Sequence, residues 1–158
     1  MTEPHPALGP LIELLGTWMG HGEGHYPTIA DFEYREEIVF TQVGKPFLAY
    51  RQRTRDARSG DPLHTEMGYL RPAGDDQFEL IMAQPTGLAD VYSGTGHDGV
   101  YDLHCDDVAR TPTAKPVLAV RRRFEIHGDR LAYDLWMAHA ETPMSHHLHA
   151  EFEREELP

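Results

Sequence analysis

Apolar and polar residues alternate with a period of two through almost the whole chain after Trp18, in short runs separated by turn-forming residues. Successive side chains of a β-strand point to opposite faces, so this period is typical of strands that bury one face. The runs are Trp18–Tyr26, Phe32–Phe40, Phe47–Gln52, Leu63–Leu70, Phe78–Ala83, Leu88–Thr95, Val100–Cys105, Val117–Ile126, Leu131–Ala138 and a last run ending near Arg154. About ten sequential strands predict an all-β fold, and the regular hairpins predict an antiparallel up-and-down β-barrel.

One short helix is expected before the first strand. Pro10 suits the first turn of a helix, the apolar residues between Leu11 and Leu15 supply a buried face, and Gly16 can end it. The two longer segments between strands, Asp106–Pro116 and His139–Ser145, are expected to be polar loops, because neither is apolar enough for a crossover helix. No linker or repeat interrupts the chain, so we expect a single domain over residues 1–158.

The charge balance limits the partners that the surface can bind. The formal net charge is −12, and the longest basic run is Arg121-Arg122-Arg123, whose side chains would alternate between the two faces of a strand. Such a surface repels phosphate, so we expect binding of neither nucleic acid nor membranes. Small molecules are the expected partners. The rim and edge residues identify no dimer face, and a homodimer stays open.

Cysteine usage and the N-terminal segment indicate the compartment. The chain has one cysteine, Cys105, no run of about 18 apolar residues and no apolar stretch near Met1 that resembles a secretory signal. One cysteine cannot build a disulfide framework, and the neighbouring acids Asp106 and Asp107 disfavour a reactive thiolate. We therefore expect a cytoplasmic protein with a structural cysteine.

Three glycines in the first expected strand need an explanation. Gly20, Gly22 and Gly24 share one strand face with Trp18. Glycine inside a strand marks a bulge, a bend or the close approach of another group. Either a flat, bulky ligand lies against this bare strand, or Trp18 closes a corner of the barrel against the N-terminal helix.

Histidines are abundant, and they gather in the segment Ser145-His146-His147-Leu148-His149. Neutral imidazole is a good ligand for zinc and iron. On a regular strand His147 and His149 share one face, a spacing compatible with a zinc site and equally with a solvent-exposed strand end. Spacing alone does not choose among the three histidines.

Strand parity places a condition on His147. The apolar face of the last strand is formed by Leu148, Ala150 and Phe152, so a regular strand would turn His147 outward. An inward His147 needs a bulge, a twist or a strand start, and the loop expected to end at Ser145 could supply one.

Motifs along the whole chain resemble those of the nitrobindin family, a group of haem-binding barrels related in shape to lipocalins and fatty-acid-binding proteins. The matching elements are Gly16-x-Trp18-x-Gly20-x-Gly22, Tyr26-Pro27-Thr28-Ile29, Phe32-Glu33-Tyr34, Gly44-Lys45-Pro46-Phe47, Leu63-His64-x-Glu66-x-Gly68-Tyr69, Pro112-Thr113-Ala114-Lys115 and His147-Leu148. They follow the family's order along the chain. The resemblance implies a ten-stranded antiparallel barrel that binds haem b near one open end.

The resemblance also implies the roles of particular residues. The cofactor-binding residues that it implies are Thr28, Leu63, His64, Lys115, Met137 and His147. Of these, His147 matches the axial ligand of the iron, and Thr28 and Lys115 match positions where a hydroxyl and a cation meet the haem carboxylates. Proteins of this type keep the iron ferric, bind nitric oxide and convert peroxynitrite to nitrate. The chain is therefore expected to be a haem-dependent peroxynitrite isomerase with no catalytic residue beyond the haem iron.

Two other functions remain alternatives. A non-catalytic carrier of an apolar small molecule would use the same barrel and would not need His147. A zinc-dependent enzyme would use the glycine- and histidine-rich rim.

Overall fold

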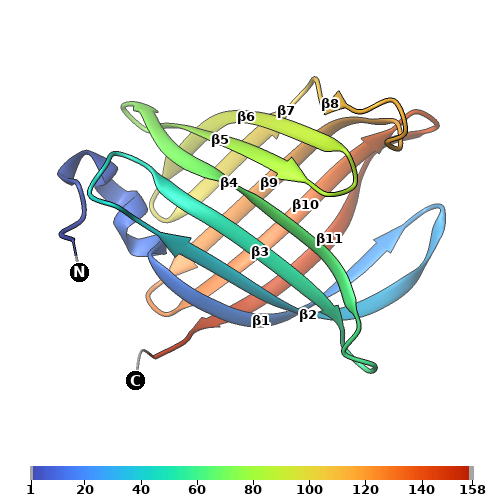
Figure 1. The fold of residues 1–158 in the computed structure, drawn as a ribbon, viewed down its shortest axis with the longest axis horizontal. Helices are drawn as coiled ribbons and strands as arrows, with labels where there is room; N and C mark the ends of the chain where they lie inside the picture. Colours follow the sequence, from blue (N-terminus) through green and yellow to red (C-terminus); the bar gives the residue numbers. More distant parts are fainter. Residues whose placement is uncertain (1, 157–158) are drawn as a thin grey trace.

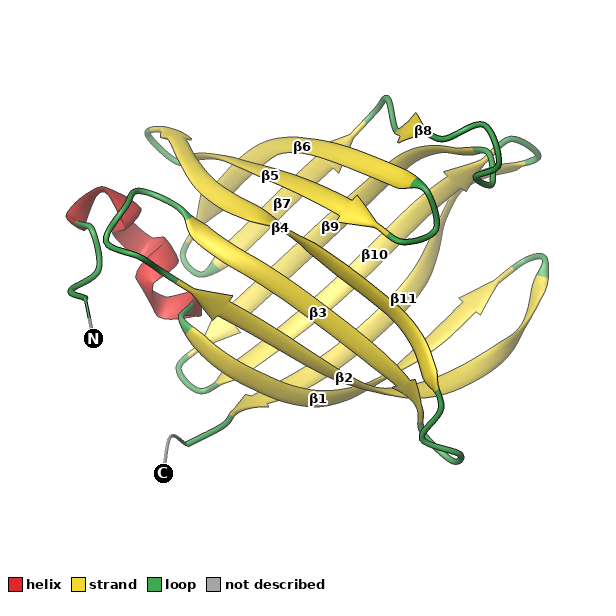
Figure 2. Ribbon diagram, in the orientation of Figure 1, coloured by secondary structure: helices red, strands yellow, loops and turns green. Residues whose placement is uncertain are grey.

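The computed structural model describes residues 2–156, and one closed β-sheet accounts for most of them. The strands are β1 (Gly16–Tyr26), β2 (Ile29–Thr41), β3 (Leu48–Asp56), β4 (Pro62–Gly74), β5 (Gln77–Gln84), β6 (Leu88–His97), β7 (Val100–Cys105), β8 (Ala109–Arg110), β9 (Val117–His127), β10 (Arg130–His139) and β11 (Thr142–Arg154). Their order is β5-β4-β3-β2-β1-β11-β10-β9-β7-β6, and the pairing of β5 with β6 closes the barrel (Figures 1 and 2). The predicted ten-stranded antiparallel barrel is confirmed, with the two-residue β8 added beside β6.

A short N-terminal helix closes one end of this barrel (Figure 2). It is a 3₁₀ helix, Pro6–Leu14, interrupted at Gly9, whose φ of 54° suits glycine. Leu8, Leu11 and Leu14 are completely buried against the strands. The indole Nε1 of Trp18 donates a hydrogen bond to the carbonyl oxygen of Leu14 at 2.8 Å. The predicted helix is therefore present, and Trp18 does close the barrel against it.

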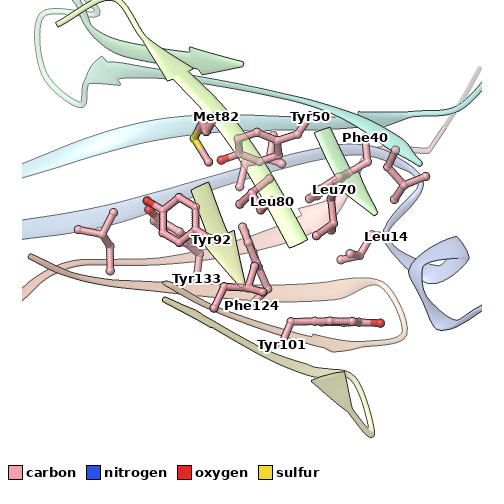
Figure 3. Close-up of a cluster of buried hydrophobic side chains, with 14 of the residues drawn as sticks. Leu14, Phe40, Tyr50, Leu70, Leu80, Met82, Tyr92, Tyr101, Phe124 and Tyr133 are labelled. Carbon is pink, nitrogen blue, oxygen red and sulfur yellow. The ribbon is translucent and has the colours of Figure 1, made fainter. Parts of the chain in front are cut away.

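The core lies between this helix and the middle of the barrel. Inward-facing residues from nearly every strand pack there, among them Phe40, Tyr50, Leu80 and Phe124 (Figure 3). The rings of Phe40 and Phe124 meet edge to face with centroids 6.2 Å apart. The helix end of the barrel is thus filled with side chains, and open space is confined to the other end.

The three glycines of β1 are covered by the protein's own aromatic rings. A Cβ atom at Gly20 would lie 2.6 Å from the ring of Phe152, and one at Gly24 would lie 2.2 Å from the ring of Phe32. A Cβ atom at Gly22 would lie 2.5 Å from the carbonyl oxygen of His149 and 2.6 Å from the ring of Tyr34. The aromatic rings of Phe32, Tyr34 and Phe152 therefore pack against the glycine face of β1. They occupy the space in which a flat ligand would have to lie.

Two segments between strands differ from the expectation. The loop predicted over His139–Ser145 shrinks to a turn at residues 140–141, because β11 already begins at Thr142. The segment Asp106–Pro116 remains largely irregular but contains β8. Within residues 2–156, no helix has the length and apolar character needed to cross a bilayer.

Candidate functional site

A cavity of about 400 Å³ lies inside the barrel at the end opposite the helix. Apolar side chains make up much of its wall, namely Phe32, Leu63, Leu88, Val117, Val120, Leu135, Met137 and Leu148. Polar groups complete it, namely Tyr34, Gln52, Thr54, His64, Glu66, Gln84, Arg122, Tyr133 and His147. A concave, mostly apolar space with a few directed polar groups is typical of a small-molecule site.

A β-bulge turns His147 into this cavity. Leu135 of β10 pairs with Leu148, and the next residue, Trp136, pairs with His146, so His147 is an extra residue of β11. The bulge lets His147 and Leu148, neighbours in sequence, both line the cavity. The alternation of inward and outward side chains shifts by one residue at the bulge. This is the irregularity that an inward His147 requires. The expectation that the strand would only begin near Ser145 is wrong.

The bulge lies next to the point where β11 stops pairing with β1, its neighbour on the side away from β10. Pairing of β1 with β11 ends at Gly24 and Leu148, and the β1–β2 hairpin then extends away from β11 (Figure 1). The ring of His147 bridges this separation, since its Nδ1 lies 2.9 Å from the carbonyl oxygen of His25. A carbonyl only accepts, so Nδ1 carries the proton and donates.

This contact leaves His147 in the form that binds metals. Burial lowers the pKa of His147 below its usual value, and the charges of His25 and His146 add to the lowering, against the opposing hydrogen bond to the carbonyl of His25. The ring is then neutral with Nδ1 protonated, and Nε2 keeps its lone pair. A histidine whose other ring nitrogen donates to a backbone carbonyl is a common arrangement in metal sites.

Two aromatic rings hold His147 from the β1–β2 side. Its ring meets Tyr26 edge to face at 5.1 Å between centroids and Phe32 at 6.4 Å. The hydroxyl of Tyr26 donates a hydrogen bond to the carbonyl oxygen of Met137 at 3.1 Å. Sequence reasoning matched Tyr26 only as part of a motif and gave it no role.

The other expected site residues fall into two groups. Leu63, His64 and Met137 line the cavity together with His147. Thr28 and Lys115 are exposed, in the β1–β2 turn and the segment before β9, which lie at the open end of the barrel. Neither contributes to the cavity wall.

The neighbouring histidines face the outer surface. His146 Nε2 and His149 Nδ1 lie 2.8 Å and 2.9 Å from Oδ1 of Asp134. His146 also meets the ring of Trp136 at 5.3 Å between centroids. Over the part of the chain that the structure describes, no group of three or more His, Cys, Asp or Glu side chains is arranged to hold a metal ion.

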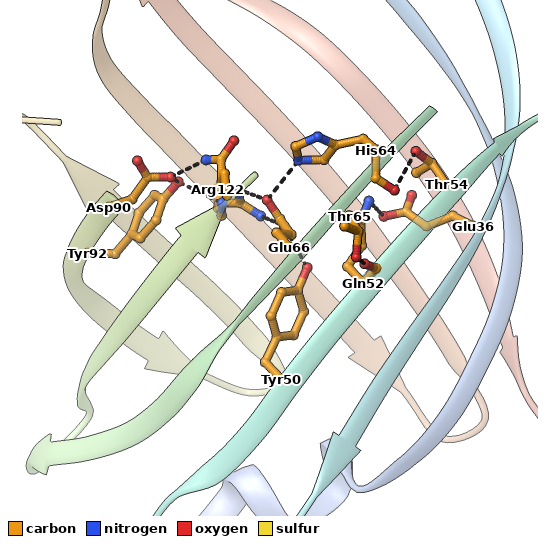
Figure 4. A network of polar contacts seen from close by, with 11 residues as sticks. Glu36, Tyr50, Gln52, Thr54, His64, Thr65, Glu66, Asp90, Tyr92 and Arg122 are labelled. Carbon is orange, nitrogen blue, oxygen red and sulfur yellow. Dashed lines mark hydrogen bonds and ion pairs between the residues drawn. The ribbon is translucent and has the colours of Figure 1, made fainter. Parts of the chain in front are cut away.

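A charged network borders the inner end of the cavity, and sequence reasoning missed it (Figure 4). The guanidinium of Arg122, 1% exposed, donates to both carboxylate oxygens of Glu66, at 2.5 and 2.8 Å. The Nε of Arg122 donates to the hydroxyl of Tyr92 at 2.7 Å, and that hydroxyl donates to Asp90 at 3.0 Å. His64 Nε2 lies 3.6 Å from Glu66 on the cavity side.

Two carboxyl groups near this network are shifted in opposite directions. Burial alone would raise the pKa of Glu66, but the charge of Arg122 and the hydrogen bonds to the carboxylate lower it to about 2. Burial raises the pKa of Glu36 to about 8, only partly offset by a hydrogen bond from Gln52. At neutral pH Glu66 is therefore ionised and Glu36 is largely protonated.

The signal for these residues was present in the strand parity. Arg122 occupies the inward position between Val120 and Phe124, and Glu36 occupies the one between Tyr34 and Ile38. A charged residue at an inward position of a strand marks a polar group inside the barrel. The sequence predicted that Arg122 lies on the opposite strand face from Arg121 and Arg123, but it did not identify Glu66 and Tyr92 as its partners.

Comparison with known proteins gives consistent matches over almost the whole chain. The family model described as "THAP4-like, heme-binding beta-barrel domain" matches residues 7–154. Peroxynitrite isomerase 1 of Rhodococcus jostii (strain RHA1) is 51% identical over 145 residues, which cover 92% of this chain and 82% of that protein. Peroxynitrite isomerase 2 of Mycobacterium ulcerans (strain Agy99) is 48% identical over 154 residues, 95% of this chain and 96% of the relative.

A solved structure agrees with these matches. The crystal structure of Rv2717c from M. tuberculosis superposes with a TM-score of 0.91 at 43% sequence identity, covering 98% of this chain and 100% of that one. Both the fold and the sequence of this chain are thus similar to those of a solved structure over almost its whole length.

Proposed function

Because the chain belongs to the family of THAP4-like heme-binding β-barrel domains, we propose that it is a ferric haem b protein that isomerises peroxynitrite to nitrate and binds nitric oxide. His147 is the single protein ligand of the iron in this proposal. The activity is proposed from the two relatives named peroxynitrite isomerase, at 51% and 48% identity.

The observation that carries the proposal is the placement of His147. The bulge brings it into the cavity wall, the carbonyl of His25 takes its Nδ1 proton, and the lowered pKa keeps the ring neutral. His146 and His149 are engaged by Asp134 on the outer face, so they do not compete for a ligand inside the barrel. His64 also lines the cavity, but its Nε2 lies 3.6 Å from Glu66 at the inner end. This arrangement supports His147 as the single protein ligand of a metal centre.

The residues around His147 also fit a large planar group. Phe32, Leu63, Met137 and Leu148 give the cavity an apolar wall, which suits the apolar faces of a porphyrin. When bound, a ferric haem supplies a Lewis-acidic iron whose positive charge stabilises a rearranging anionic oxidant. The chain itself contributes the neutral imidazole of His147, the apolar cavity wall and the opening at the rim.

Thr28 and Lys115 are proposed to act at that opening. Both are exposed at the end of the barrel where the cavity lies. A hydroxyl and an ammonium group there can hydrogen-bond to the carboxylates of a bound haem without entering the cavity.

A carrier of an apolar small molecule is the second candidate, and the apolar wall favours it. Such a carrier would bind its ligand equally well after replacement of His147. For zinc, the described residues supply no cluster of ligands, so the geometry gives that reading no support.

We also propose a homodimer and a cytoplasmic location. Met67, Tyr69, Ile81 and Val91 are exposed, and Tyr69, Ile81 and Val91 are direct cross-strand partners on the outer face of β4, β5 and β6. A continuous exposed apolar patch of this kind is typical of a protein interface. The single cysteine, which is buried, suits a reducing compartment.

Titration of the purified protein with haemin tests the proposal. A Soret band should saturate at about one equivalent, since His147 is the single proposed ligand of the iron. His147→Ala should lose this band, whereas His146→Ala and His149→Ala, whose side chains face outward, should keep it. Stopped-flow decay of peroxynitrite with nitrate analysis then measures the activity.

The outcomes of these measurements distinguish a haem-dependent isomerase from a binding protein without this activity. A wild-type protein without a Soret band would remove the haem proposal, and a band retained by His147→Ala would move the ligand to another residue. A haem complex that leaves the nitrate yield at the buffer level would leave a binding protein without isomerase activity.

A further inference from the structure

The inner end of the cavity contains a complete carboxylate-binding site, and it is already filled. Arg122 presents its guanidinium fork there, and both arms are occupied by the two oxygens of Glu66. The hydroxyl of Tyr50 donates to the same carboxylate at 2.9 Å. An arginine fork with an additional hydroxyl donor is the set of groups that binds a free carboxylate bidentately.

Glu66 and Tyr92 together engage all three guanidinium nitrogens of Arg122. Its third donor, Nε, is used by Tyr92, and the rings of Tyr92 and Tyr133 lie 5.1 and 5.7 Å from the guanidinium carbon. Glu66 itself is 3% exposed and belongs to β4, whereas Arg122 belongs to β9. The carboxylate is thus supplied by a different strand.

Stability alone does not account for this pair. A buried ion pair is often no more stabilising than apolar side chains of the same volume, because both charges must lose their water. The pair is also part of a wider network, because Glu66 accepts from the hydroxyl of Tyr50 and Arg122 donates to the hydroxyl of Tyr92.

An unpaired Arg122 would make the barrel a strong anion binder. A buried guanidinium attracts any carboxylate that can reach it, and an apolar cavity above it suits the tail of an amphiphilic acid. Glu66 is tethered beside Arg122, so a free carboxylate has to displace a partner of high effective concentration.

We propose that Glu66 is a specificity-determining residue, a built-in carboxylate that occupies Arg122 and closes the inner end of the cavity to carboxylate ligands. Neutral apolar groups can still fill the space above it. The role does not depend on the proposed haem chemistry, because every group involved belongs to the chain.

Replacement of Glu66 by alanine, followed by chemical rescue, tests this role. Glu66→Ala removes the carboxylate and leaves a space the size of a small acid beside Arg122. Acetate should raise the melting temperature of this variant, and acetamide or sodium chloride at the same concentration should not. The wild type should show no response specific to acetate. If the variant is unfolded alone, refolding by acetate, followed by circular dichroism, counts as the same result.

Two further measurements complete the test. Glu66→Ala should bind decanoate about tenfold or more tighter than the wild type does, while the affinity for decanol stays unchanged. The double variant Glu66→Met with Arg122→Met removes both charges and should lose the response to acetate. Equal effects of acetate and acetamide on Glu66→Ala, failure of acetate to refold it, or equally tight decanoate binding by the wild type would each overturn the proposal.

Discussion

Tyr26, the last residue of β1, reaches across β11 and donates a hydrogen bond to the carbonyl oxygen of Met137 on β10. The strand that it crosses is the one that carries the bulge, and its ring contacts the edge of His147 there. The β1–β2 hairpin has already left the ladder of β11 at this level. One phenol therefore ties the free end of the hairpin to the far side of the bulge and holds the candidate ligand between them.

Tyr26→Phe keeps the ring and removes this tie. Loss of one buried hydrogen bond should lower the free energy of unfolding by about 1 kcal/mol, measured by urea denaturation. Haemin affinity should fall several-fold, because the wall behind His147 is no longer fixed. Tyr69→Phe is the matched control, compared at the same protein concentration, because it changes an exposed phenol of the proposed dimer face on β4 and not the surroundings of His147. Equal behaviour of the two variants would contradict a positioning role for Tyr26.

His147 should titrate below the usual value of 6.5 and carry its proton on Nδ1 when neutral. Two-dimensional ¹H–¹⁵N NMR of the histidine rings in the haem-free protein measures both properties. Since the folded-state pKa lies below the unfolded one, the unfolded chain takes up this proton first, and the contribution of His147 to stability declines as the pH falls through 6.5. His146→Ala removes a nearby positive charge and should raise the pKa of His147. Titration at or above 6.5, or a proton on Nε2, would disagree with the structure.

Gly24→Ala should shrink the cavity. The new methyl group would lie 2.2 Å from the ring of Phe32, which lines the cavity wall, so the ring must move. We expect weaker haemin binding and a loss of about 1–3 kcal/mol in stability from overpacking. Adding Phe32→Leu should restore part of both losses. A double variant that is no better than Gly24→Ala alone would show that the clash is not with this ring.

Glu36 should make the protein less stable as the pH rises. Its folded-state pKa of about 8 lies above the usual value of 4.5, so the folded state holds a proton that the unfolded state releases. This stabilising contribution is complete below about pH 4.5 and is lost progressively up to about pH 8. Urea unfolding between pH 5 and pH 8 should show a decline that Glu36→Gln removes, as long as the amide keeps the contact with Gln52. An unchanged slope in Glu36→Gln would assign the decline to other groups.

Val91→Lys tests the proposed dimer face. A charge in the middle of the apolar patch on β4, β5 and β6 should shift the protein toward the monomer in sedimentation velocity. Met19→Lys, at an exposed apolar position on β1, should leave the distribution unchanged. A wild type that is monomeric at high concentration would remove the proposal.

The barrel itself could be predicted from the sequence, because its information is local. Each strand carries its own period of two and each hairpin its own turn residues, so β3 or β9 is recognisable without reference to its partners. The glycines of β1 were ambiguous for the opposite reason. What fills the space above them is Phe152 on β11 and Tyr34 and Phe32 on β2, a fact of register between strands.

The candidate site was predictable only in part. The alternation of the last strand predicted an outward His147. The bulge that turns it inward depends on how Leu135 and Trp136 of β10 pair with β11. The Glu66–Arg122 pair was missed because its members are 56 residues apart and meet only when the barrel closes. The sequence shows both Glu66 and Arg122 as charged residues at inward positions, but it does not show that they pair with each other.

The bulge has a consequence for how such a site can arise. Leu135 pairs with Leu148 and Trp136 with His146, so β11 carries one residue more than β10 at this point, and a second register shift follows between Met137 and His139. One additional residue in a barrel strand thus places two sequence neighbours, His147 and Leu148, in the same cavity wall, which a regular strand cannot do.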